Sequence, residues 1–158
     1  MNREEVLEIL QSVKDPEIPK LSIVDLGVVT DVEITNDKLK VVLTPTFSGC
    51  PALKVMEDDV KNAIKELPFD EKEVTVSFEK QWSSNLISER GRKILKESGF
   101  APPPKINGLV QIDTFKKVKC PFCESDNTNL QTPFGPTLCR AIHYCNNCKQ
   151  AFEQFKPV

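Results

Sequence analysis

Two short stretches, Cys120-Pro-Phe-Cys123 and Cys145-Asn-Asn-Cys148, decide how the C-terminal third of this 158-residue chain folds. Two residues between a pair of thiolates allow a tight turn that aims both sulfur atoms at one ion, and two such turns complete a tetrahedron. The first residues do not resemble a secretory leader, so we expect a cytosolic chain, in which paired Cys-x-x-Cys motifs indicate a metal rather than a disulfide framework. The spacing therefore predicts a structural zinc site formed by all four cysteines.

The same four ligands also suit a single iron or an iron–sulfur cluster, and the sequence does not choose among these metals. Zinc is favoured by its abundance and because four protein ligands close the site. A closed site leaves no position for water, so no catalysis is assigned to this metal. The alternative is four reduced thiols without a metal. Free thiols do not explain how a segment of about 50 residues folds, since chains of that size usually need a cross-link such as a bound metal or a disulfide.

Two further residues lie just ahead of the second cysteine pair and could replace a ligand. Cys139 ends the turn-rich run that begins Phe134-Gly-Pro-Thr, and we expect this loop to present its thiol beside the metal as an auxiliary or exchange residue. The commoner role of such a cysteine is that of a small buried hydrophobe, so the auxiliary role of Cys139 is the less favoured interpretation. For His143, the only histidine, an ordinary strand or loop position is favoured over metal ligation.

N-terminal to the cysteine pairs, hydrophobic periodicity predicts alternating helices and strands. Asn2 and Glu5 form a capping box for the first helix, and Asn36-Asp37 forms the turn of a hairpin. The predicted elements are a helix over residues 2–14, strands over 28–34 and 39–43, a helix over 51–67, a strand over 73–79, and a helix from Ser83 or Ser84 to Gly99.

This order predicts an α+β fold, a small sandwich of helices on a three-stranded sheet, followed by a β-rich zinc ribbon. The proline-rich stretch Ala101-Pro-Pro-Pro-Lys105 cannot continue a helix and is typical of a stiff spacer. We therefore expect an α+β domain over residues 1–100, a linker over 101–107 and the ribbon over 108–158.

The charge distribution argues against nucleic acid as a partner. Residues 1–107 carry 15 Lys and Arg against 19 Asp and Glu, and residues 108–158 carry 6 against 4. Neither part has the basic surface that binding to phosphates requires. Trp82, the only tryptophan, is interpreted as a core or interface anchor rather than a base-stacking platform. No apolar run approaches the roughly 18 residues of a membrane helix, so we expect a cytoplasmic protein that does not enter a membrane.

The remaining cysteine, Cys50, follows the run Thr44-Pro-Thr-Phe-Ser-Gly and precedes a predicted helix. A helix N-terminus favours the thiolate form of a cysteine, so Cys50 is a candidate nucleophile or metal ligand; the alternative is an inert thiol. Asp15 and Glu17 are candidate oxygen ligands for iron. Their alternative role is to shape the turn that stops the first helix.

Several motifs together resemble a known family. They are Asp15-Pro-Glu-Ile-Pro19, Ile23-Val-Asp-Leu-Gly27, the run from Thr44 to Pro51, the stretch from Trp82 to Leu95, Gly99-Phe-Ala-Pro-Pro103, and the cysteine ribbon with its Phe134-Gly-Pro-Thr loop. Residues 1–100 resemble the MIP18-like (DUF59) iron–sulfur assembly domain. The whole chain resembles the PaaD family, also called PaaJ, of the phenylacetyl-CoA epoxidase (phenylacetate-CoA oxygenase) system.

The resemblance implies an accessory protein that helps to mature iron–sulfur or other metal centres of a multicomponent oxygenase and does not itself catalyse the oxygenation. It makes Cys50 the expected cluster-handling thiol, with a transient iron or iron–sulfur cluster as cargo, and supports Asp15 and Glu17 less strongly. The implied partners are oxygenase or reductase subunits and iron–sulfur assembly proteins, and the implied oligomeric state is a homodimer. The alternative is a docking subunit without metal transfer. An enzyme with Cys50 as nucleophile ranks last, because the sequence supplies no paired base.

Overall fold

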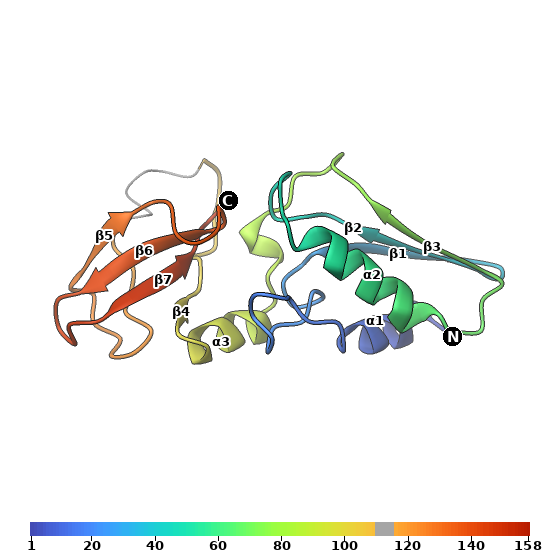
Figure 1. Ribbon diagram of the computed structural model, residues 1–158, viewed down its shortest axis with the longest axis horizontal. Helices are drawn as coiled ribbons and strands as arrows, with labels where there is room; N and C mark the ends of the chain where they lie inside the picture. The colour runs from blue at the N-terminus through green and yellow to red at the C-terminus, as the bar shows by residue number, and fades with distance from the viewer. Residues whose placement is uncertain (110–115) are drawn as a thin grey trace. The chain divides into compact units, whose positions relative to one another are not determined.

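The computed structural model describes residues 1–109 and 116–158, which form two compact units, Met1–Trp82 and Ser83–Val158 (Figure 1). Each unit contains its own β-sheet, with the strand order β1-β2-β3 in the first and β4-β7-β6-β5 in the second. The elements of the first unit are α1 (Arg3–Leu10), β1 (Val29–Thr35), β2 (Lys38–Leu43), α2 (Leu53–Ile64) and β3 (Glu71–Val76).

The first helix and the hairpin form as their local sequence signals predict. Asn2 Oδ1 accepts a hydrogen bond from the Glu5 N–H at 2.9 Å, and Glu5 Oε2 accepts one from the Asn2 N–H at 2.8 Å. In the hairpin turn between β1 and β2, Asn36 has a φ of 53°, a left-handed conformation that asparagine tolerates. Both predictions are confirmed.

The third strand completes the sheet through a crossover. β2 pairs antiparallel with β1 and parallel with β3, and α2 forms the connection that a parallel pair needs. Helices α1 and α2 lie on one face of this sheet (Figure 1). The first unit is therefore the helix-on-sheet sandwich of the predicted α+β class.

Aliphatic side chains fill the space between these helices and the sheet. The α2 stripe of Met56, Val60 and Ile64 is at most 2% exposed, and Leu43 of the central strand is fully buried. Each such side chain contributes about 1.5–3 kcal/mol on burial. Trp82 is also buried, and its Nε1 donates to the Leu26 carbonyl at 3.1 Å, which confirms the core-anchor interpretation.

The second unit contains the cysteine pairs within a mixed sheet. Its elements are η1 (Ser84–Leu86), α3 (Glu89–Glu97), β4 (Phe100–Ala101), β5 (Thr128–Thr132), β6 (Arg140–Cys145) and β7 (Ala151–Phe155). β4 is parallel to β7, whereas β6 is antiparallel to both β5 and β7. This C-terminal unit is β-rich, as expected.

The structure differs from the prediction around residues 83–107. Helix α3 begins at Glu89 rather than near Ser83, because the Ser88 side chain accepts a hydrogen bond from the Gly91 N–H at 2.9 Å. Ser83 caps only the short 3-10 turn η1. The two units divide after Trp82, whereas the predicted linker covered 101–107. Ala101 pairs with Gln154 of β7, so the start of the proline-rich stretch is a strand of the second unit.

No helix in residues 1–109 or 116–158 is both long enough and apolar enough to span a bilayer.

Candidate functional site

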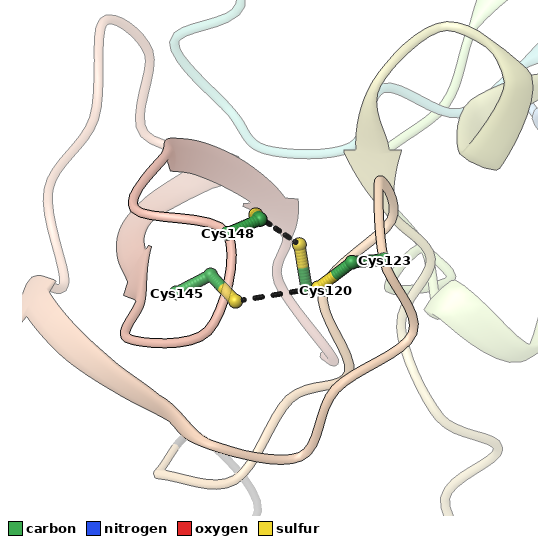
Figure 2. Close-up of side chains that lie close together, drawn as sticks. All are labelled: Cys120, Cys123, Cys145 and Cys148. Atoms are coloured by element: carbon green, nitrogen blue, oxygen red, sulfur yellow. Dashed lines mark hydrogen bonds between the residues drawn. The ribbon is translucent and has the colours of Figure 1, made fainter.

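The four predicted metal ligands converge on one point. Their Sγ atoms all lie within 4.8 Å of one another, at 3.7 Å between Cys120 and Cys148 and 3.5 Å between Cys123 and Cys145 (Figure 2). A tetrahedron with metal–sulfur bonds of about 2.3 Å has sulfur atoms about 3.8 Å apart, whereas a disulfide bond measures about 2.05 Å. The four cysteines therefore fit a tetrahedral metal ion and not a pair of disulfides.

The two cysteine turns repeat the same backbone geometry. The N–H of the first cysteine in each turn donates to the carbonyl five residues later, from Cys120 to Ser125 at 3.0 Å and from Cys145 to Gln150 at 2.9 Å. The residue four positions after that cysteine is left-handed in both, with φ 61° at Glu124 and 59° at Lys149. The backbone of each turn thus has the shape that presents two thiols to one point, and the metal site consists of two such turns.

An apolar cluster supports the site from one side. Cys120 and Cys145 are buried together with Ala101, Val118 and Phe152, whereas Cys123 and Cys148 are half-buried at its edge. Cys145 thus ends the strand β6, and the cysteine turns pack against the apolar cluster. This arrangement preorganises a structural metal site.

The protonation of the thiols also favours a bound cation. Asn147 Nδ2 donates to Cys123 Sγ at 3.5 Å and lowers the pKa of this thiol to about 6, with help from the Ser125 backbone. Burial, followed by the neighbouring sulfur atoms, raises the pKa of Cys148 to about 12. Four adjacent thiols resist simultaneous ionisation unless a metal compensates their charge. Asn147 lies inside the second Cys-x-x-Cys motif, but the spacing of the motif did not reveal its contact with Cys123.

Cys139 does not lie where the sequence predicted. It precedes β6, and Cys145 is the last residue of that strand. An extended strand rises about 3.3 Å per residue, so the two cysteines lie roughly 20 Å apart. Cys139 Sγ instead lies 3.0 Å from Thr137 Oγ1. The expectation of an auxiliary ligand beside the metal is therefore corrected.

His143 is a buried strand residue, as its ordinary interpretation predicted. Its ring stacks on Phe152 at 5.5 Å, and its Nε2 lies 3.0 Å from Gln154 Oε1. Burial lowers the pKa of His143, which favours the neutral imidazole. The ring contributes packing to the sheet and does not belong to the cysteine group.

Cys50 lies in the turn that leads into α2. Its N–H donates to the Phe47 carbonyl at 3.3 Å, and its own carbonyl accepts from the Leu53 N–H at 3.2 Å. Helix α2 begins at Leu53 rather than at Pro51, so Cys50 lies two residues before the N-cap, Ala52. The Cys50 residue is half-buried.

Asp15 has the turn-forming role that was its alternative interpretation. Its Oδ1 accepts hydrogen bonds from the N–H groups of Glu17 at 2.8 Å and Ile18 at 2.9 Å. The Asp15 residue is 9% exposed, whereas Glu17 is exposed. Asp25, in the motif Ile23-Val-Asp-Leu-Gly27, is also buried, and its Oδ2 accepts from Ser22 Oγ at 2.9 Å.

Comparisons with known proteins assign both parts of the chain. The profile of the PaaD zinc beta ribbon domain matches residues 108–156, and that of the iron-sulfur cluster assembly protein family matches residues 3–77. Over 154 residues the chain is 32% identical to the Escherichia coli K12 protein named as the D component of a putative 1,2-phenylacetyl-CoA epoxidase, covering 98% of this chain and 92% of that protein. The chain belongs to the PaaD family of phenylacetyl-CoA epoxidase components.

The N-terminal part of this PaaD family member has further relatives. The Bacillus subtilis protein named Fe-S protein maturation auxiliary factor YitW is 34% identical over 88 residues, which are 54% of this chain and 85% of that protein. The crystal structure of a DUF59 domain from Bacillus anthracis has 30% identity and a TM-score of 0.54, and covers 58% of this chain and 89% of that one. The predicted DUF59-like α+β fold is confirmed.

Proposed function

We propose that this protein is an accessory factor that helps to load iron–sulfur or other metal centres into a multicomponent oxygenase of the phenylacetyl-CoA epoxidase type. The name of the Escherichia coli relative supports the oxygenase system, and the name of the Bacillus subtilis relative supports iron–sulfur maturation. The protein acts in the cytoplasm, with oxygenase or reductase subunits and assembly proteins as its partners.

The placement of Cys50 is the observation that carries this proposal. The thiol lies in the turn that leads into α2, two residues before the N-cap, and the positive end of the helix dipole favours an anion near this end of the helix. Its neighbour Gly49 leaves the backbone open, because the nearest atoms to a Cβ added there are Phe47 ring carbons at 3.8 and 4.0 Å. An iron ion or a small cluster can therefore approach the chain beside the thiolate.

Cys50 acts in this proposal as a transient thiolate ligand of the cargo. One thiolate holds a cluster weakly enough to release it, in contrast to the four thiolates that keep zinc in the ribbon. Asp15 and Glu17 are proposed as supplementary oxygen ligands. The zinc site shapes the surface that docks the recipient protein and takes no part in redox or hydrolytic chemistry.

Anaerobic reconstitution with ferrous iron and sulfide tests the role of Cys50. We expect the wild-type protein to retain iron and sulfide, and Cys50→Ser to retain neither while keeping one zinc. Cys139→Ser is the matched control, because Cys139 is also half-buried and also lies outside the metal cluster. Equal iron retention in wild type and Cys50→Ser overturns the proposed role of this thiol.

The docking alternative, in which the protein only binds its partners, predicts a different pattern. In that case Cys50→Ser changes neither iron content nor the activity of the recipient oxygenase, whereas Cys145→Ser abolishes complex formation. The cluster content of the co-expressed oxygenase subunits separates the two functions. Asp15→Asn tests the supplementary ligand, because an asparagine Oδ1 can still accept the two backbone hydrogen bonds while the negative charge is lost.

A further inference from the structure

A cavity of about 360 Å³ lies within the Ser83–Val158 unit, next to the first cysteine turn. Its wall includes Cys120, one of the four metal ligands, and Pro121, the residue that follows it. The volume falls in the usual range of small-ligand pockets, about 300–1,000 Å³. The function proposed above does not use this cavity.

The walls of the cavity are apolar and stiff. They include Ala101, Pro102, Pro104, Val118 and Pro121. Proline has a fixed φ and no N–H group, so three of these wall residues offer no backbone hydrogen-bond donor. The body of a ligand must therefore be hydrophobic, and little of the wall has to rearrange to bind it.

The polar groups of the cavity are mainly hydrogen-bond donors. Lys117 and Lys119 are exposed at its rim, and within residues 1–109 and 116–158 neither lies at ion-pair distance from a carboxylate, although Glu124 attracts Lys119 at longer range. The single lining carboxylate, Glu124, already pairs with Lys96. A ligand must therefore bring acceptors, and negative charge, to the two lysines.

A buried amide side chain also belongs to the cavity lining. Gln154 lines the cavity and is fully buried, and its Oε1 is taken by His143 Nε2 at 3.0 Å. The Nε2 of Gln154 is buried without a hydrogen-bond partner among the described residues. A buried donor without a partner costs about 1–3 kcal/mol, so a ligand that reaches it recovers that energy.

The charge of the whole unit agrees with an anionic ligand. Ser83–Val158 carries 11 Lys and Arg against 6 Asp and Glu, whereas Met1–Trp82 carries 10 against 17. With four thiolates and one divalent metal included, the second unit still has a net positive charge. The field around the cavity therefore attracts anions.

We propose that this cavity binds an apolar carboxylate, that is, a compact hydrophobic group that ends in a carboxylate. The hydrophobic group contacts the proline and valine walls, and the two carboxylate oxygens accept hydrogen bonds from Lys117 and Lys119. A carboxylate suits this site better than a phosphate, because the proline walls lack the many N–H donors that phosphate sites use. The ligand is either a free organic acid or the carboxyl-terminal residue of another polypeptide.

Calorimetric titration of the zinc-loaded full chain tests the proposal. The probes are phenylacetate and hexanoate, their neutral amides, and a tetrapeptide that ends in leucine, with either a free carboxylate or a carboxamide. We expect saturable binding of at least one carboxylate probe, and at least about tenfold weaker binding of its amide, which corresponds to 1.4 kcal/mol. Binding of the acids alone identifies a free organic acid as ligand, and binding of the peptide alone identifies a polypeptide terminus.

Paired variants connect this binding to the cavity. Because Lys117 and Lys119 are exposed, we expect the double variant Lys117→Gln, Lys119→Gln to fold, to keep one zinc, and to bind the carboxylate at least about tenfold more weakly. Lys149→Gln is the matched control, since Lys149 follows the second cysteine turn and does not line the cavity. Cobalt-substituted protein supplies an independent signal, because a ligand that contacts Cys120 shifts its visible spectrum. Absence of saturable binding, equal binding of acid and amide, or equal binding by the double variant overturns the proposal.

Discussion

Met1–Trp82 buries 18 hydrophobic residues, whereas the described residues of Ser83–Val158 bury nine, of which Cys120 and Cys145 are metal ligands. The first unit has enough apolar side chains for a core of the usual kind. The second has about half as many in a similar length, so it depends on the four thiolates as a staple. One chain thus combines a unit that folds by its core with a unit that folds by its metal.

The two units also differ in charge. The first has an excess of seven acidic residues and the second an excess of five basic residues. The difference in charge is smaller when the sequence is divided at the proline-rich stretch. In that division α3, with its arginines and lysines, is counted with the acidic N-terminal residues. The metal-dependent unit is thus also the one with an excess of basic residues.

Removal of the metal is expected to produce the largest difference in stability between the two units. Structural zinc contributes on the order of 10 kcal/mol to the folding of small domains. We therefore expect a strong chelator, or Cys145→Ser, to unfold Ser83–Val158 while Met1–Trp82 stays folded. Two-dimensional NMR measures this as selective loss of dispersed amide signals from the second unit. Cys139→Ser is the control and should retain every signal. Simultaneous unfolding of both units would contradict the independence of the first core.

Truncation of a side chain in the core of Met1–Trp82 is expected to destabilise the first unit and to leave the second unit unchanged. Leu43 is fully buried in the central strand β2, so Leu43→Ala should lower the free energy of unfolding of Met1–Trp82 by about 2–5 kcal/mol. Zinc stoichiometry should remain unchanged. Val55→Ala is the matched control, because Val55 of α2 is 48% exposed and its truncation should cost less than about 0.5 kcal/mol. Urea denaturation with zinc quantification measures both, and loss of zinc in Leu43→Ala would contradict the prediction.

The turn after α1 is expected to give a smaller change. Asp15→Ala removes the acceptor of two backbone hydrogen bonds and should lower the stability of the first unit by about 1–2 kcal/mol. Asp15→Asn should recover most of this loss, because its side-chain oxygen can occupy the same position. Urea midpoints of the two variants measure the difference. If both variants lose the same stability, the charge of Asp15 and not its capping oxygen supports the turn.

Local signals in the sequence predicted most of the fold and the metal site. The capping box at Asn2 and the turn at Asn36 depend on neighbouring residues only, and the Cys-x-x-Cys spacing fixes the thiol turns. The ribbon family match begins at residue 108, as predicted for the ribbon, but the compact units divide after Trp82. The pairing of Ala101 with Gln154 and the hydrogen bond from the Ser84 N–H to the Val158 carbonyl join residues far apart in the sequence, which local patterns do not encode. The expected position of Cys139 was wrong for a similar reason. Cys139 lies close to Cys145 in the sequence, but the extended strand β6 separates the two residues in space.

Relief of backbone strain in the cysteine turns is expected to give the smallest change in stability. The sign of this change shows whether backbone strain or side-chain contacts dominate at the left-handed position. Lys149 has a φ of 59°, where a residue with a Cβ is less stable than glycine, so Lys149→Gly should raise the stability of the zinc-loaded second unit by about 0.5–1 kcal/mol. Glu124→Gly should gain less, because it also removes the ion pair with Lys96. Gly99→Ala is the opposite control, since its φ is 85° and the new Cβ would lie 3.3 Å from the Phe122 ring, so it should destabilise. Thermal unfolding of the zinc-loaded variants measures all three. A loss of stability in Lys149→Gly would mean that contacts of the lysine side chain outweigh its backbone strain.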